Sequence, residues 1–92
     1  MNIMPSNKKT FTAEEAKVIG SRLKVDWNKT DLEQFRMGLN VELEHGLADP
    51  KTNVTNDNLD VTGKIALAHL NEIPDYYTRL AEMEAAAEKK NN

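Results

Sequence analysis

The sequence contains no cysteine, which excludes disulfide bonds, thiolate nucleophiles and every metal site built on cysteine. Aromatic residues are scarce as well, at 5% of the 92 residues, so the core must be built largely from small aliphatic side chains. A chain of this length forms one domain and buries about 60–65% of the surface that its unfolded form exposes. These absences predict a single small domain of modest stability.

Long apolar runs and an excess of positive charge are absent too. No segment approaches the ~18 apolar residues of a membrane span, and the first ten residues lack the apolar core of a signal peptide. Twelve basic residues are scattered among fifteen acidic ones, giving a net charge of -3 and no basic stripe. We therefore expect a cytoplasmic protein that binds neither membranes nor nucleic acid.

The hydrophobic spacing predicts an all-α fold, a compact bundle of about four short helices with one long polar loop between the second and third. Helical periodicity covers residues 13–24, 31–45, 59–71 and 74 onward, and no strand pattern competes. The inner faces predicted for the four helices, in chain order, are Ala16, Ile19 and Leu23; Leu32, Phe35, Leu39 and Leu43; Val61, Ile65, Ala68 and His69; and Tyr76 or Tyr77 with Leu80, Met83 and Ala87.

Local signals place the helix ends. Thr12 with Glu15, and Thr30 with Glu33, have the spacing of capping boxes, and Phe11 before the first box can pack on Ala16 as a hydrophobic staple. Gly20 lies off the apolar face of the first helix, where it weakens the helix by roughly 1 kcal/mol relative to alanine. Proline is favoured at the first helical position, so Pro74 opens the fourth helix.

The expected organisation is a disordered lead-in over residues 1–10, a helical domain over 11–88 and a frayed tail over 89–92. The segment 81–92 is helix-prone but poor in large apolar groups. We expect it to project beyond the core as a solvated end, and a role in docking or dimerisation is the alternative.

The loop over residues 47–58 reads LADPKTNVTNDN, and long ordered loops in small domains are often functional. Its oxygen-bearing side chains lack the glycine and glutamate positions of an EF-hand, which argues against calcium. An exposed aromatic is a good interface anchor, so we include the two tyrosines that follow the third helix in the same predicted contact region as the loop. The predicted contact region consists of Asn53, Thr55, Asn56, Asp57, Tyr76 and Tyr77.

Glutamate and histidine recur at a spacing of three near two helix ends. Glu42 and His45 share one helix face, and so do His69 and Glu72, in reversed order. Such side chains can hold zinc, manganese or iron if they converge. Histidine is also favoured at helix C-termini on electrostatic grounds alone, so capping and an interhelical hydrogen bond form the competing interpretation.

Several longer segments carry a family resemblance: ELEHG, DPKTNVTND, TGKIALAHL and PDYYTRL. With them, residues 11–84 resemble a family of small uncharacterised proteins of bacteria, archaea and tailed phages, a domain of unknown function. The resemblance supports the fold and domain limits. It implies no activity, cofactor or partner, and the phage members suggest a phage-encoded or virion-associated role.

We therefore predict a non-catalytic module that binds another protein and needs no cofactor. The alternative is a small protein that binds a divalent transition metal through Glu42, His45, His69 and Glu72. A homodimer could complete such a site by bringing the set together twice. The alternative requires that the four side chains converge.

Overall fold

The computed structural model describes residues 10–90. In chain order the elements are α1 (Ala13–Arg22), α2 (Leu32–Glu42) with its 3-10 extension η1 (Leu43–His45), α3 (Leu59–Glu72) and α4 (Tyr76–Lys90). The all-α bundle with a long loop before α3 is confirmed. Residues 1–9 of the expected lead-in and 91–92 of the expected tail lie outside the described residues. None of the described helices is long and apolar enough to cross a membrane.

The start of α1 follows the predicted capping box. The Glu15 amide donates to the Thr12 hydroxyl, and the Thr12 amide donates to the Glu15 carboxylate. Phe11 and Ala16 are both buried, as the staple requires.

The second predicted box is wrong, because Asp31 and not Thr30 caps α2. The Asp31 carboxylate accepts from the Gln34 amide, while Thr30 is buried and donates its amide to the carbonyl of Asp26. Asp31, one residue later, satisfies the Gln34 amide, and its negative charge suits the positive end of the helix dipole.

The inner faces of α1 and α2 agree with the spacing. Ile19, Phe35 and Leu39 are buried together, with Leu23 and Leu43 partly buried at the edge of the same core. Gly20 is also buried, which the spacing did not predict. The Trp27 ring from the connector lies so close that a β-carbon at Gly20 would approach it to 2.5 Å. Because glycine has no side chain, the tryptophan ring can pack directly against α1 at this position.

The inner face of α3 is rotated by one residue from the predicted one. Thr62, Ala66 and Leu70 are buried, whereas Val61 and Ala68 are exposed. Small residues allow α3 to approach α2 closely, and the Thr62 hydroxyl donates to the Asn58 carbonyl, so its burial leaves no donor unpaired. Close packing of small residues thus outweighs the larger apolar surface of valine.

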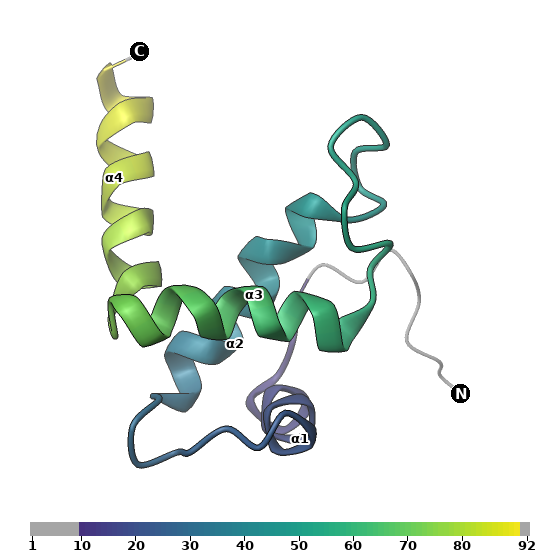
Figure 1. The fold of residues 1–92 in the computed structure, drawn as a ribbon. Coiled ribbons are helices and arrows are strands. Elements are labelled where there is room, and N and C mark those ends of the chain that lie inside the picture. The colour runs from purple at the N-terminus through teal and green to yellow at the C-terminus, as the bar shows by residue number, and fades with distance from the viewer. Residues whose placement is uncertain (1–9, 91–92) are drawn as a thin grey trace.

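α4 leaves the bundle after its first turn. Figure 1 shows it turning sharply at the end of α3 and rising away from the crossed pair α2 and α3. Tyr77 is buried and Leu80 partly buried, but every residue from 81 to 89 is exposed. The prediction that Met83 and Ala87 face the core is therefore wrong, because no other part of residues 10–90 covers this half of the helix. The expectation of a projecting end agrees with this arrangement.

Candidate functional site

The carboxylate of Glu42 lies buried where α2, α3 and α4 meet, with only 3% of the residue exposed. A buried carboxylate is costly unless it accepts hydrogen bonds. Here the Tyr77 hydroxyl donates to Oε2 of Glu42 across 2.7 Å, joining the first turn of α4 to the last turn of α2. The pair helps to fix the position of α4 on the bundle, together with the Gln34 side chain of α2, which donates to the Thr78 hydroxyl and accepts from the Tyr77 amide.

Two histidines flank the same carboxylate from different elements. Nε2 of His45, on η1, lies 3.5 Å from Oε1 of Glu42, and Nε2 of His69, on α3, lies 3.6 Å from Oε2. Their side chains are 49% and 38% exposed, so each imidazole is open to solvent on one side. When either histidine is protonated, it forms an ion pair with Glu42. We call Glu42, His45, His69 and Tyr77 the Glu42 cluster.

Aromatic stacking holds one of these imidazoles. The His69 ring stacks on Tyr76 with the ring centroids 4.3 Å apart and the planes 3° from parallel, and Tyr77 meets it edge-on. His69 is therefore fixed by α4 as much as by its own helix. Tyr76 is partly buried beneath this stack and Tyr77 is buried completely, so neither tyrosine stands free as an anchor.

Burial raises the pKa of the Tyr77 phenol well above its ordinary value of 10.0, and the hydrogen bond to Glu42 raises it further. Both effects favour the neutral phenol, because an ionised one would face a carboxylate in a water-poor site. Tyr77 therefore stays a hydrogen-bond donor at neutral pH. Its role in the cluster is structural.

Three of the four residues proposed as metal ligands come together, and Glu72 does not join them. Glu72 is exposed at the end of α3 and has no ion pair among the described residues. The two imidazoles approach different oxygens of Glu42, instead of one common point. Across residues 10–90, no group of three or more histidine, aspartate or glutamate side chains is arranged to hold a metal ion. The geometry suits interhelical ion pairing.

The loop candidates bond chiefly to one another. The Asn53 amide group donates to Oδ1 of Asn56, the Asn56 backbone amide donates back to Oδ1 of Asn53, and the Asp57 amide donates to the Thr55 hydroxyl. Thr55 is buried, and Asn56 and Asp57 have φ of 53° and 60°. Asparagine and aspartate tolerate this left-handed conformation better than most residues. These side chains therefore shape the loop.

The loop is also tied to the end of α2. The Leu47 amide donates to the Asp57 carboxylate, and the Val54 amide donates to the His45 carbonyl at 2.6 Å. Oδ1 of Asp57 would lie 1.9 Å from a β-carbon at Gly46, so a larger residue there would displace the Asp57 carboxylate from the Leu47 amide. Besides its polar residues, the loop also presents two apolar side chains to solvent: Val54 is 75% exposed and Leu47 is 49% exposed.

A shallow hollow beside the cluster is lined by Glu44, His45, Ala48, Asp49 and Thr52. It is open to solvent and contains none of the buried groups of the Glu42 cluster. The sequence led to two conflicting expectations for Met83, one placing it on the inner face of the fourth helix and the other placing it in a projecting segment over residues 81–92; the structure agrees with the second.

Comparison with known proteins places the chain in a family without assigning an activity. Neither a curated protein nor a solved structure shows significant similarity to it. Residues 16–86, which include most of α1, the loop, the Glu42 cluster and most of α4, match a family model. The chain belongs to the family described as Protein of unknown function (DUF5661).

Proposed function

We propose that this protein is a non-catalytic module that binds another protein through α4. The observation that carries the proposal is the exposure of α4 beyond its first turn, where Met83 is 61% exposed and nothing in residues 10–90 packs against it. Helices of fewer than about 12–15 residues are marginal in water without tertiary contacts. A partner lying on α4 would supply the contacts that this half of the helix lacks.

The polar residues of the site support binding over catalysis. The Tyr77 hydroxyl is committed to Glu42, and the loop side chains bond to their own backbone and to each other. The committed groups hold α4 and the loop in place, which is what a binding surface needs from its scaffold.

The alternative of metal binding is favoured by one observation, the approach of His45 and His69 to the same carboxylate. Since they reach opposite oxygens of that carboxylate, we propose a module that needs no cofactor. A partner in the cytoplasm or in a phage particle would suit such a module equally.

The test compares two matched surface substitutions in the full chain. Met83→Ser alters α4, and Val18→Ser alters an equally exposed position on α1, with 60% exposure against 61%. Immobilised protein should capture the same partner in the wild type and in Val18→Ser. Met83→Ser should lose about ten-fold in affinity, the effect of removing an interface anchor worth 1–2 kcal/mol. Equal loss in both variants, or in neither, contradicts a binding role for α4.

A further inference from the structure

We infer that the attachment of α4 to the bundle is sensitive to pH, and that protonation of His69 strengthens it. Imidazole is the side chain whose ordinary titration lies between about pH 5 and pH 8. A histidine that contacts both α4 and a buried carboxylate can therefore couple the docking of the helix to the surrounding pH. Such a contact acts on the docking of α4 whatever the helix binds.

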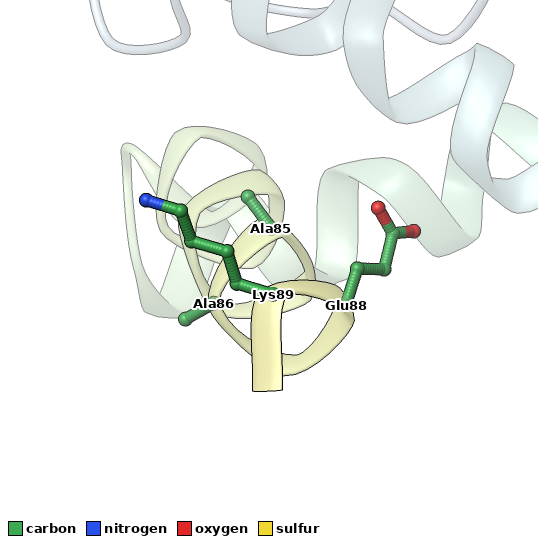
Figure 2. A pocket seen from close by; sticks show the side chains of 4 residues that line it. All are labelled: Ala85, Ala86, Glu88 and Lys89. Carbon is green, nitrogen blue, oxygen red and sulfur yellow. The ribbon is translucent and has the colours of Figure 1, made fainter. Parts of the chain in front are cut away.

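The attachment of α4 is confined to its first turns. Tyr77 is buried and Leu80 is partly buried, whereas residues 81–89 are all exposed. The hollow drawn in Figure 2, near the far end of the helix, is lined by Ala85, Ala86, Glu88 and Lys89, all from α4 itself. A change in the few contacts at the base of α4 therefore acts on most of its attachment.

His69, on α3, lies where these basal contacts meet. Its Nε2 is 3.6 Å from Oε2 of Glu42 on α2. Its ring stacks on Tyr76 of α4, with the centroids 4.3 Å apart and the planes 3° from parallel, and the Tyr77 ring meets it edge-on at 6.2 Å. Side chains from α2 and α4 thus both contact one imidazole of α3.

A proton on His69 strengthens two of these contacts. The cation is attracted to the Glu42 carboxylate, and a cation over the face of a tyrosine within about 6 Å is attracted to the ring. When α4 undocks, His69 loses Tyr76 and the Glu42 carboxylate loses the cover of Tyr77, so both attractions weaken. Protonated His69 therefore favours docked α4. This contribution is present below the titration range of imidazole and is lost as the pH rises through it.

The other titratable groups around His69 do not reproduce this effect. The Tyr77 phenol stays neutral, because burial and Glu42 raise its pKa. Asp75, at the start of α4, is paired with Arg79 of the same helix. Glu72, three residues after His69 on α3, is exposed to solvent.

His45 is the group that resembles His69 most closely, and it provides the matched control. Its Nε2, on η1, lies 3.5 Å from Oε1 of Glu42, so its protonation also forms an ion pair with this carboxylate. None of the ring contacts among residues 10–90 joins His45 to α4, however. The two histidines share a carboxylate, and they differ in the stack on Tyr76.

Hydrogen exchange of one backbone amide measures the docking. The Tyr77 amide donates to Oε1 of Gln34 on α2, a bond that exists only while α4 is docked. Its protection factor, obtained by NMR and corrected for the intrinsic exchange rate at each pH, should be about three-fold higher at about pH 5.5 than at about pH 7.5. His69→Gln should abolish this difference, and His45→Gln should retain it. The Leu39 amide, in the buried part of α2, reports opening of the whole bundle.

A second pair of variants tests the stack. Tyr76→Leu keeps an apolar side chain over His69 but removes the aromatic face, so the difference between the two pH values should shrink, whereas Tyr76→Phe should retain it. Tyr77 protection that is independent of pH in the wild type, or equally dependent on pH in His69→Gln, would overturn the inference. A change of the same size at Leu39 would also overturn it, because the pH would then act on the whole bundle.

Discussion

Tyr77 on α4 donates a hydrogen bond to the buried carboxylate of Glu42 on α2, 35 positions earlier in the chain. The bond uses the carboxylate that the two histidines flank, and it lies at the base of the only described helix that leaves the bundle. The bond therefore contributes to the orientation of α4, together with the stack of Tyr76 on His69 and the two hydrogen bonds of the Gln34 side chain to the first turn of α4.

Replacing Tyr77 with phenylalanine should destabilise the protein by about 1–3 kcal/mol, because the Glu42 carboxylate would stay buried without its donor. Urea denaturation followed by circular dichroism measures the change. Tyr76→Phe is the matched control, since the Tyr76 ring stacks on His69 and its hydroxyl has no hydrogen bond among the described residues. A loss of similar size in both variants would contradict a specific role for the bond.

The same bond predicts how stability changes in alkali. The pKa of Tyr77 is raised in the folded state by burial and by Glu42, so the folded chain retains its phenolic proton while the unfolded chain loses it near pH 10. The contribution of Tyr77 is therefore fully present below about pH 10 and is lost as the pH rises above that value. The free energy of unfolding should fall less steeply between pH 9 and pH 11 in Tyr77→Phe. Parallel slopes would contradict the assignment.

Two glycines should respond differently to alanine. A β-carbon at Gly38 would lie 2.5 Å from the Tyr77 ring and 2.8 Å from the β-carbon of Ala66, neither of which can move aside. Gly38→Ala should cost about 1–3 kcal/mol despite its better helix propensity. At Gly63 the nearest atom is the end of the partly exposed Leu23 side chain, at 2.7 Å. Gly63→Ala should therefore cost clearly less, and thermal melts of the two variants test the order.

Removal of metal should leave the protein unchanged. His45 and His69 reach different oxygens of Glu42, so they do not offer a shared coordination point. Melting temperatures with and without EDTA should coincide, and elemental analysis of untagged protein should find metal far below one equivalent. A melting temperature that falls with chelator would instead make Glu42, His45 and His69 ligands.

Local rules predicted the parts of the fold that neighbouring residues decide. The Thr12 box, the buried pair Phe11 and Ala16, and the apolar face of α2 all follow from spacings of three and four. The prediction of the buried face of α3 was wrong. Hydrophobicity favours Val61 over Ala66 as a core residue, whereas the close approach of α2 requires the smaller side chain. Size at a helix contact depends on the partner helix, which the spacing within one helix does not describe.

The sequence allowed most residues of the candidate site to be predicted, but not which side chain donates to Glu42. Spacing placed Glu42 and His45 on one face and included His69, and these three do meet. It could not tell that Tyr77, one position from Tyr76, would supply the donor, because adjacent residues on a helix point about 100° apart. Which of them turns inward depends on how α4 begins after Pro74.

The packing of Trp27 against Gly20 and the bond of Tyr77 to Glu42 give the protein two optical reporters in different places. Trp27, the only tryptophan, meets Phe35 edge-on with ring centroids 5.8 Å apart, at the side of the bundle formed by α1 and α2. Tyr77 lies where α4 is attached to α2. Tryptophan emission thus follows the opening of α1, and phenolate absorbance at high pH follows the release of α4. Midpoints that differ between the two signals would separate undocking of α4 from melting of the bundle.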